Sequence, residues 1–384
     1  LTSLYPSSVR PNEGLFAERR WERMRERGHE IHVVHPLPWA PFSFGKPEWR
    51  EIRAMPARES RAGIDIEHPR YLHVPRLARA NARAFAKAGI AALFAHGRPD
   101  VVVADYAWPA SAVADELLRR KLPLVINGRG SDVLQVGADP ALAPVLAHNL
   151  KSAAHWCAVS QHLVDAMDRL AAAPGRGVLV PNGVDLALFC VRDQGAARRA
   201  LGWNFEGQLV LVVGHLIERK DPLLALAAFA VLDATLGERT NVVFIGRGPL
   251  QARLLAEITG RGLEGRAHVI GEVPANELAT WYAAADALLL TSSREGRPNV
   301  VLEALACGLP VLATEAGGTA EVLGALDGML ARTRDAHALA QQLAALLARE
   351  PDRAALRRHV EPLSWTRGLE ALEGVLEAAI GARR

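Results

Sequence analysis

The chain of 384 residues is half hydrophobic and 23% charged, which is typical of a globular protein with substantial cores. Its net charge of +3 is too small to indicate nucleic-acid binding, and no apolar run is long enough to predict a membrane-spanning helix. The three cysteines show neither disulfide nor metal-site spacing, which fits a reducing compartment, so we expect a cytoplasmic protein. Because the chain opens inside a strand pattern without Met, we also expect that a few residues precede Leu1.

Apolar runs alternate with helical patterns through the first half of the chain. The expected strands lie near residues 1–5, 31–35, 101–105, 122–126, 156–160 and 178–180. The expected helices lie near residues 16–27, 79–95, 110–120 and 161–170. This alternation predicts a parallel sheet whose strands are connected by crossover helices.

The same alternation restarts after a polar join around residues 189–202. The expected strands of this second half lie near residues 209–213, 242–245, 267–270, 287–290 and 310–314. The expected helices lie near residues 222–236, 249–259, 276–284, 298–306 and 336–348. An amphipathic helix over 365–379 closes the chain after Pro362.

The predicted fold class is α/β, with two tandem Rossmann-like doubly wound domains at 1–190 and 191–362. Ligands of such sheets bind outside the carboxyl ends of the strands. We therefore expect the two domains to face each other across a cleft. The polar motifs described next all fall at strand ends on that side.

Two acids, Glu295 and Glu303, stand eight positions apart around a predicted strand–turn–helix connection. Pro298 suits the first helical position, where its missing N–H is not needed. The backbone N–H groups at the N-terminus of this helix have no intrahelical partner and can bind a phosphate. They belong to the segment of Gly296, Arg297, Asn299 and Val300. A carboxylate beside such a site usually accepts hydrogen bonds from sugar hydroxyls. The two acids therefore predict binding of two sugars, a nucleotide ribose and a hexose beyond the diphosphate.

Two cations, Arg219 and Lys220, follow the strand expected at 209–213. A departing nucleoside diphosphate develops negative charge, which a fixed cation stabilises. We therefore predict that both residues take part in catalysis together with Glu295. The alternative is a solvated basic loop.

The segment from Glu295 reads EGRPNVVLEALACG and is followed by PVLATEAGGTAEVL. It resembles the E-x7-E signature of the retaining glycosyltransferases of family 4, which have the GT-B fold, and the resemblance covers nearly the whole chain. The resemblance implies that Glu303 binds the ribose, Lys220 the diphosphate and Glu295 the transferred sugar. It also implies that the backbone of Val273 lies near the base, and that Gly317, Gly318 and Glu321 complete a loop-ordering GG-x-x-E motif.

The sequence departs from the family pattern at two positions. His215 stands where the family carries an arginine, and it can supply charge when protonated, or Arg219 can replace it. Arg129 stands where many members carry a histidine that faces the donor sugar. An arginine there is compatible with a phosphate or a substrate carboxylate, and the alternative is a strand-end turn with an Asp cap. Gly14 precedes the first helix in a loop that the family places against the donor phosphates or the acceptor.

The resemblance implies a function as well. The second domain would hold a nucleotide-diphosphate sugar, with UDP or GDP as the nucleotide, and the first would present a glycan or lipid-linked acceptor. Transfer of the hexosyl unit would retain the anomeric configuration by front-face attack, without a metal ion or other cofactor. Polysaccharide biosynthesis is the implied setting, and the terminal helix over 365–384 would cross back onto the first domain.

The first ninety residues are basic, with sixteen Lys and Arg against ten Asp and Glu. Aromatic residues at 39–44 stand near Arg50 and Arg53, which predicts contact with an anionic surface on the inner face of the cell membrane. A solvated face is the alternative, because glutamates are interleaved with the arginines of the first helix.

Three other classes of protein are alternatives to a glycosyltransferase. A non-catalytic partner subunit that binds a nucleotide sugar remains open because of His215 and Arg129, although the intact Glu295, Glu303 and Lys220 argue against it. A GT-B epimerase would need acid and base groups around the sugar that the sequence does not identify. A dehydrogenase is disfavoured because no G-x-G-x-x-G motif follows the first strand of either half.

Overall fold

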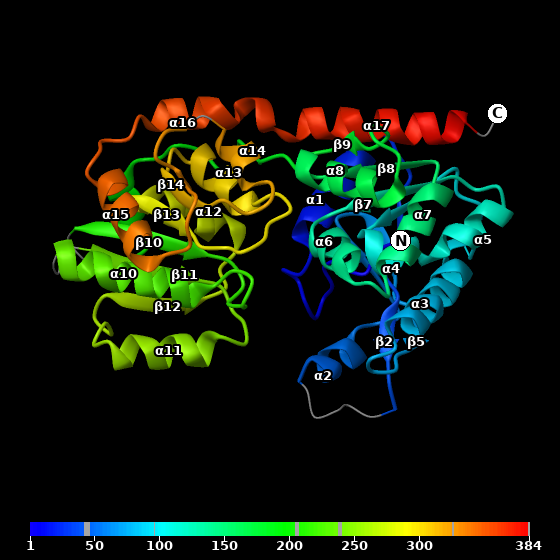
Figure 1. The fold of residues 1–384 in the computed structure, drawn as a ribbon, viewed down its shortest axis with the longest axis horizontal. Helices are drawn as coiled ribbons and strands as arrows, with labels where there is room; N and C mark the ends of the chain where they lie inside the picture. The colour runs from blue at the N-terminus through cyan, green and yellow to red at the C-terminus, as the bar shows by residue number, and fades with distance from the viewer. Residues whose placement is uncertain (42–46, 96, 204–206, 237–239, 325, 383–384) are drawn as a thin grey trace. The chain divides into compact units, whose positions relative to one another are not determined.

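The computed structural model describes residues 1–41, 47–95, 97–203, 207–236, 240–324 and 326–382, and the chain divides into two compact units (Figure 1). Unit 1 comprises Leu1–Asn182 and Thr366–Arg384, and unit 2 comprises Gly183–Trp365. The boundary lies at 182–183 and not at the expected 190, because Val184 and Phe189 are buried in the core of unit 2. The cleft between the domains stays a prediction.

Unit 2 is built on a parallel sheet in the order β12-β11-β10-β13-β14-β15. The strands are β10 (Gln208–Val213), β11 (Thr240–Ile245), β12 (Ala267–Gly271), β13 (Ala287–Leu290), β14 (Val311–Thr314) and β15 (Leu330–Ala331). Numbered along the chain, this order is 3-2-1-4-5-6, the doubly wound arrangement of dinucleotide-binding sheets. Strands β11, β13 and β14 are buried along their whole length, as expected for a parallel sheet with both faces covered.

Helices of unit 2 alternate with these strands. They are α9 (Gln194–Ala200), α10 (Pro222–Leu236), α11 (Gln251–Gly260), α12 (Ala275–Ala284), α13 (Asn299–Ala306), α14 (Thr319–Leu323), α15 (Ala336–Leu347), α16 (Arg353–Val360) and the 3₁₀ turn η2 (Glu361–Leu363). Asp193, Asp335 and Asp352 begin three of them, each accepting a backbone N–H of the first turn with its carboxylate. The alanine- and leucine-rich inner faces join the strands in one core.

Unit 1 contains a parallel sheet in the order β6-β7-β8-β9, a sheet β1-β4-β3 and the pair β2-β5. Their bounds are β1 (His32–Val34), β2 (Leu37–Trp39), β3 (Arg58–Arg61), β4 (Ile64–Glu67), β5 (Arg70–Leu72), β6 (Val102–Asp105), β7 (Leu124–Gly128), β8 (His155–Ala158) and β9 (Val178–Leu179). The helices are α1 (Leu15–Glu26), α2 (Pro47–Ala54), α3 (Ala78–Leu93), α4 (Ala107–Ala110), η1 (Ser111–Val113), α5 (Ala114–Arg119), α6 (Ser131–Ala138), α7 (Ala143–Ser152), α8 (Gln161–Ala171) and α17 (Trp365–Gly381).

The strand expected over 1–5 is reduced to a single bridge between Thr2 and Asp105. Thr2 N donates to Val34 O at 3.0 Å and Asp105 N donates to Leu1 O at 2.9 Å, so the first two residues connect β1 to β6. The ladder stops there because the Thr2 hydroxyl bonds the backbone of Leu4 on both its N–H and its C=O, which turns the chain away. The helix expected over 110–120 is likewise divided into α4, η1 and α5.

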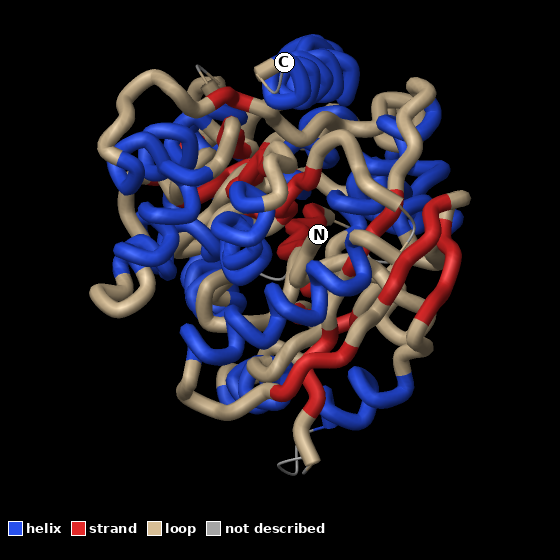
Figure 2. The backbone as a smooth tube through the Cα atoms, turned by 90° about the vertical axis from the view of Figure 1, so that its right-hand side faces the viewer, coloured by secondary structure: helices blue, strands red, loops and turns tan. Residues whose placement is uncertain are grey.

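The terminal helix α17 belongs to unit 1 from Thr366 onwards and is the blue helix at the C label in Figure 2. From Leu369 onwards its buried hydrophobic residues recur at helical spacing on one face, and they are Leu369, Leu372, Val375, Leu376 and Ala379. Glu373 accepts both Nε and Nη2 of Arg27, at 2.7 and 2.6 Å. Apolar burial and this bidentate pair therefore hold α17 to unit 1.

Candidate functional site

The predicted cations and acids come together at one edge of the unit 2 sheet. The strand order reverses between β10 and β13, so their following helices run to opposite faces and leave an opening at the carboxyl ends. Several hydrogen bonds join the loop after β10 to the loop after β13. Among them, Ser293 N donates to Arg219 O at 2.8 Å, and the Thr291 hydroxyl donates to Asp221 O at 2.8 Å. This edge is where doubly wound sheets bind nucleotides.

An ion pair between Lys220 and Glu295 forms the centre of this edge. Lys220 Nζ lies 2.6 Å from Glu295 Oε1, and Arg219 Nη1 lies 3.3 Å from Oε2. The Glu295 side chain is only 6% exposed. Burial acts to raise the pKa of Glu295, but the charge and hydrogen bond of Lys220, with the charge of Arg219, outweigh it and hold the pKa below its ordinary value. Glu295 is therefore an ionised hydrogen-bond acceptor.

The second acid, Glu303, lies in α13 and is buried. The Tyr282 hydroxyl donates to Glu303 Oε2 at 3.2 Å, a contact that the sequence analysis missed. Pro298 was expected as the first helical residue, but it is the N-cap, with φ −77° and ψ 100°. Because those angles are not helical, the helix begins at Asn299, and the amides of Asn299 and Val300 belong to its first turn.

Two glycines hold the backbone of this edge in place. A Cβ on Gly317, whose φ is +53°, would lie 1.9 Å from Glu295 O. Gly318 N also donates to Glu295 O at 3.4 Å, so the loop before α14 packs on the backbone of the acid. At the neighbouring loop, a Cβ on Gly246 would lie 2.1 Å from Gly214 O. Only glycine permits these close approaches.

The remaining predicted donor residues lie at different distances from this centre. His215 is exposed in the same loop as Lys220, whereas Val273 follows β12, two strands away from β10. Gly14 and Arg129 belong to unit 1. Gly14 is buried with φ +79° as the N-cap of α1. The predicted contacts of these residues with a donor stay predictions.

Arg129 is paired within unit 1. Its Nε and Nη2 each donate to Asp105 at 2.7 Å, and its Nη1 donates to Asn182 Oδ1 at 2.9 Å. The guanidinium also lies 5.0 Å from the centre of the Phe16 ring. Burial acts to lower the pKa of Arg129, but Asp105 raises it above its ordinary value. The carboxylate that this arginine binds belongs to the chain itself.

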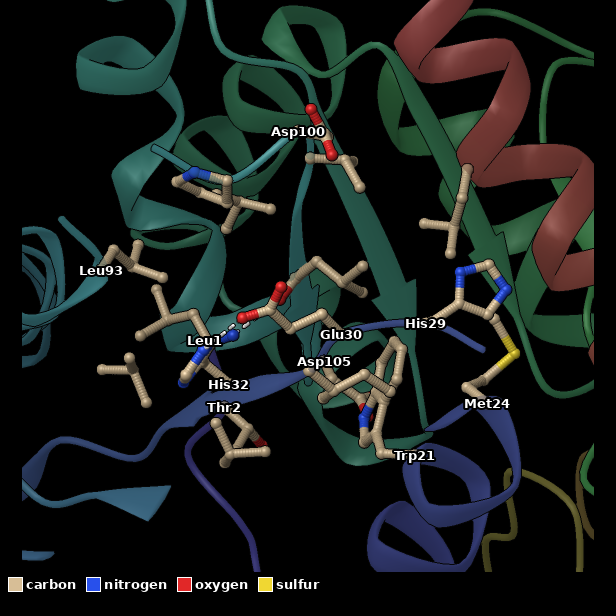
Figure 3. A pocket seen from close by; sticks show the side chains of 18 of the residues that line it. Leu1, Thr2, Trp21, Met24, His29, Glu30, His32, Leu93, Asp100 and Asp105 are labelled. Carbon is tan, nitrogen blue, oxygen red and sulfur yellow. Dashed lines mark hydrogen bonds and ion pairs between the residues drawn. The ribbon is translucent and has the colours of Figure 1, made fainter. Parts of the chain in front are cut away.

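A cavity of about 390 Å³ lies in unit 1 beside Leu1 (Figure 3). Trp21, Met24, His29 and Glu30 line it, together with α17 residues such as Leu376. None of the predicted site residues is among the described residues that line it. Position in the fold and the ion pair, not cavity size, therefore identify the candidate site.

Among the described residues, no group of three or more His, Cys, Asp or Glu could hold a metal ion. No helix in the part of the chain that the structure describes is long and apolar enough to cross a membrane.

Comparison with known families gives a match in each half of the chain. The family model described as Glycosyltransferase Family 4 matches residues 21–188. The model described as Glycosyl transferases group 1 matches residues 193–361, which include β10, β13 and the Lys220–Glu295 pair.

Individual proteins and solved structures agree with these matches. The chain is 31% identical over 368 residues to the putative teichuronic acid biosynthesis glycosyltransferase TuaC of Bacillus subtilis, covering 89% of this chain and 87% of that protein. It is 36% identical over 225 residues to a D-inositol 3-phosphate glycosyltransferase of Geodermatophilus obscurus, covering 56% of this chain and 50% of that protein. Anabaena HepE in complex with UDP shares the fold, with a TM-score of 0.73 over 97% of this chain and 98% of that chain at 18% identity. The chain is therefore an enzyme of glycosyltransferase family 4 with the GT-B fold.

Proposed function

We propose that the enzyme transfers a hexosyl unit from a nucleotide-diphosphate sugar to a glycan or lipid-linked acceptor, with retention of configuration. The observation that carries this proposal is the Lys220–Glu295 pair, with the carboxylate buried, at the switch point of the unit 2 sheet and beside the N-terminus of α13. A helix N-terminus favours phosphate, and an ionised carboxylate favours sugar hydroxyls.

In the proposed mechanism the diphosphate lies against the first amides of α13 and the ammonium of Lys220. An ammonium has three donors, so Lys220 can keep its bond to Glu295 and still bind a phosphate oxygen. Lys220 and Arg219 then stabilise the charge that develops on the departing nucleoside diphosphate. Glu295 accepts hydroxyls of the transferred sugar, and Glu303 accepts those of the ribose.

Retention is proposed to proceed by front-face attack, with the leaving phosphate oxygen taking the acceptor's proton. The lowered pKa of Glu295 supports this, because a carboxylate held ionised by two cations is a weak base at neutral pH. No side chain then needs to remove the proton. We propose that the reaction needs no metal ion.

The ligands and names of similar proteins favour particular donors and products within this proposal. HepE was solved with UDP and with UDP-glucose, which favours a UDP sugar as the donor, with GDP sugars as the alternative. The name of TuaC states a role in teichuronic acid biosynthesis, which favours a cell-envelope polysaccharide as the product.

Donor binding provides the first test. Calorimetry without added metal, against UDP, GDP, ADP and their common sugar conjugates, should give clear binding for one nucleotide series. Glu303→Ala should weaken that binding about tenfold or more, because it removes charge-assisted bonds to the ribose. Glu257→Ala, at an exposed acid on α11 paired with Arg261, is the matched control and should bind as wild type. Wild-type affinity in Glu303→Ala would refute the ribose assignment.

A membrane-facing surface is proposed for unit 1. Large exposed apolar side chains gather on β2, β5 and the start of α3, and they are Trp39, Leu72, Val74 and Leu77. Trp39 lies directly across from Leu72 in the β2–β5 pair. Exposed cations stand in α2, in α3 and in the segment before α3, and they are Arg50, Arg76, Arg79 and Arg83. The predicted aromatics Phe42 and Phe44 lie outside the described residues.

This surface should bind anionic lipid. Burial of its apolar side chains and attraction of its cations to anionic headgroups both contribute to the binding free energy. Wild-type protein should co-sediment with phosphatidylglycerol vesicles and not with phosphatidylcholine vesicles. The paired change Trp39→Ser with Leu72→Ser should reduce the bound fraction, as should Arg76→Glu with Arg79→Glu. Leu118→Ser, at an exposed leucine of α5, should change nothing. Absence of wild-type binding to the anionic vesicles would remove the proposal.

A further inference from the structure

Arg297 is a buried arginine with unused hydrogen-bonding capacity. Its side chain lies in the turn between Glu295 and α13, and the residue is only 9% exposed. Its Nε is enclosed and has no hydrogen-bond partner among the described residues. Enclosing an unbonded donor of a charged group costs free energy, and such groups are rare in native proteins. A buried guanidinium of this kind therefore indicates a partner that the protein alone does not supply.

The charges around Arg297 do not meet this need. Burial lowers the pKa of Arg297, and the charge of Glu321 in α14 only partly offsets that effect, because the pKa stays below its ordinary value. The nearest acid along the chain, Glu295, is already bound by Lys220 and Arg219. Lys220 and Arg219 pair with Glu295, whereas no ion pair joins Arg297 to that acid.

The position of Arg297 connects it to the donor. Its backbone lies directly before the N-cap Pro298, in the turn where we place the diphosphate. The backbone two residues before it is closely packed, because a Cβ on Gly317 would lie 1.9 Å from Glu295 O and Gly318 N donates to the same oxygen. A buried side chain on a packed backbone loses little conformational freedom when it binds a ligand.

We propose that the Arg297 guanidinium binds an anionic oxygen of the donor, beyond the contacts that the backbone amides and Lys220 make. This inference rests on the proposed function of the same site. Two parts of a donor can carry such oxygens: the diphosphate, or a carboxylate on the transferred sugar when the donor is a nucleotide-diphosphate uronic acid. The planar fork of an arginine fits either group in a bidentate manner.

A purely structural role is the competing explanation. Arg297 would then only order the loop before α14 through the charge of Glu321. Such a role affects thermal stability, but it does not alter the affinity of the site for one ligand relative to another. The relative affinities for different ligands are therefore the decisive measurement.

The experiment compares Arg297→Met, Arg297→Lys and wild type by calorimetry. Methionine keeps an unbranched apolar stem and buries no charge, so it should fold, and lysine keeps the charge without the fork. Arg294→Gln is the matched control, because Arg294 is an exposed cation in the same turn. The ligands are UDP, UDP-glucose and UDP-glucuronic acid, or GDP, GDP-mannose and GDP-mannuronic acid if the donor screen selects GDP.

We expect Arg297→Met to weaken binding about tenfold or more for every ligand that carries the recognised anion, and Arg297→Lys to weaken it less. Equal weakening of all three ligands assigns the diphosphate. Weakening of the uronic acid conjugate alone assigns the sugar carboxylate. Arg294→Gln should stay within about twofold of wild type, because a solvated charge contributes little.

Unchanged affinity for all three ligands in a folded Arg297→Met variant would overturn the inference, and a lowered melting temperature without that change would point to the structural role. Failure of the proposed function itself would be seen separately, because wild type would then bind no nucleotide in the donor screen.

Discussion

Lys220→Ala is expected to lower kcat/KM for sugar transfer by about a hundredfold to a thousandfold, the loss typical of removing one donor that stabilises transition-state charge. The ammonium lies 2.6 Å from Glu295 Oε1, so the change also releases the acid from its closest partner. Arg219 remains 3.3 Å from Glu295, which keeps the carboxylate partly paired and the unit folded. Product formation from the donor selected by the screen, measured beside circular dichroism spectra, tests both statements.

Glu295→Ala should give a loss of the same size, since it removes the proposed acceptor of the sugar hydroxyls. The double variant should lose much less than the product of the two single losses, because residues in direct contact act together. Lys151→Ala, at an exposed lysine of α7, is the control for loss of a surface charge. Turnover at the wild-type rate in either single variant would refute the site.

Asp105→Ala is expected to cost unit 1 about 3–5 kcal/mol of unfolding free energy, the range for breaking a buried ion pair. Asp105 Oδ1 accepts Asn127 Nδ2 and Arg129 Nε, while Oδ2 accepts Trp21 Nε1 and Arg129 Nη2. Its loss leaves Arg129 and the nearby Arg20 buried without this acid. Burial, with the charge of Arg129, already lowers the pKa of Arg20 to about 9.

The stability that Asp105 contributes to unit 1 depends on pH in a defined direction. Burial acts to raise the pKa of Asp105, but Arg129 and Arg20 hold it well below the ordinary value of 3.8. The stabilisation is therefore fully present above pH 3.8 and is lost as the pH falls through the lowered value. The difference in unfolding free energy between wild type and Asp105→Ala should stay constant from about pH 5 to 8 and become smaller in stronger acid.

Urea unfolding followed by a probe in unit 1 measures this difference, because two units need not unfold in one transition. Glu30→Ala is the matched control in unit 1: its carboxylate lies 3.4 Å from His32 Nε2 while 92% exposed, so it should cost less than about 1 kcal/mol. A loss for Asp105→Ala no larger than that of Glu30→Ala would show that the network is dispensable.

The sequence predicted the sheet of unit 2 better than that of unit 1, for a physical reason. Strands buried on both faces, such as β11 and β13, read as continuous apolar runs that need no knowledge of their neighbours. The short strand β3 alternates between exposed and half-buried residues, and pairing with β4 forms it. The segment around β2 to β5 was missed for this reason.

The site was predictable where chemistry follows from position along the chain. Glu295, Lys220 and Arg219 stand in the loops that follow two strands of one sheet, so the sequence predicted that they meet at one edge. The partner of Arg129 was not predictable, because Asp105 lies 24 residues away and the register between β6 and β7 brings the two together. Tyr282 reaches Glu303 from another helix, and no sequence motif signals that contact.

The discontinuous make-up of unit 1 has a consequence for how the chain matures. Residues 1–182 emerge from the ribosome first, but the helix that covers their apolar surface follows only after all of unit 2 has been synthesised. Unit 2 is one uninterrupted stretch and can fold as soon as it has emerged. Until α17 supplies Leu369, Leu372 and Glu373, the early part of unit 1 lacks both an apolar cover and the acid that binds Arg27. The half of the molecule that is translated first is therefore the half that finishes folding last.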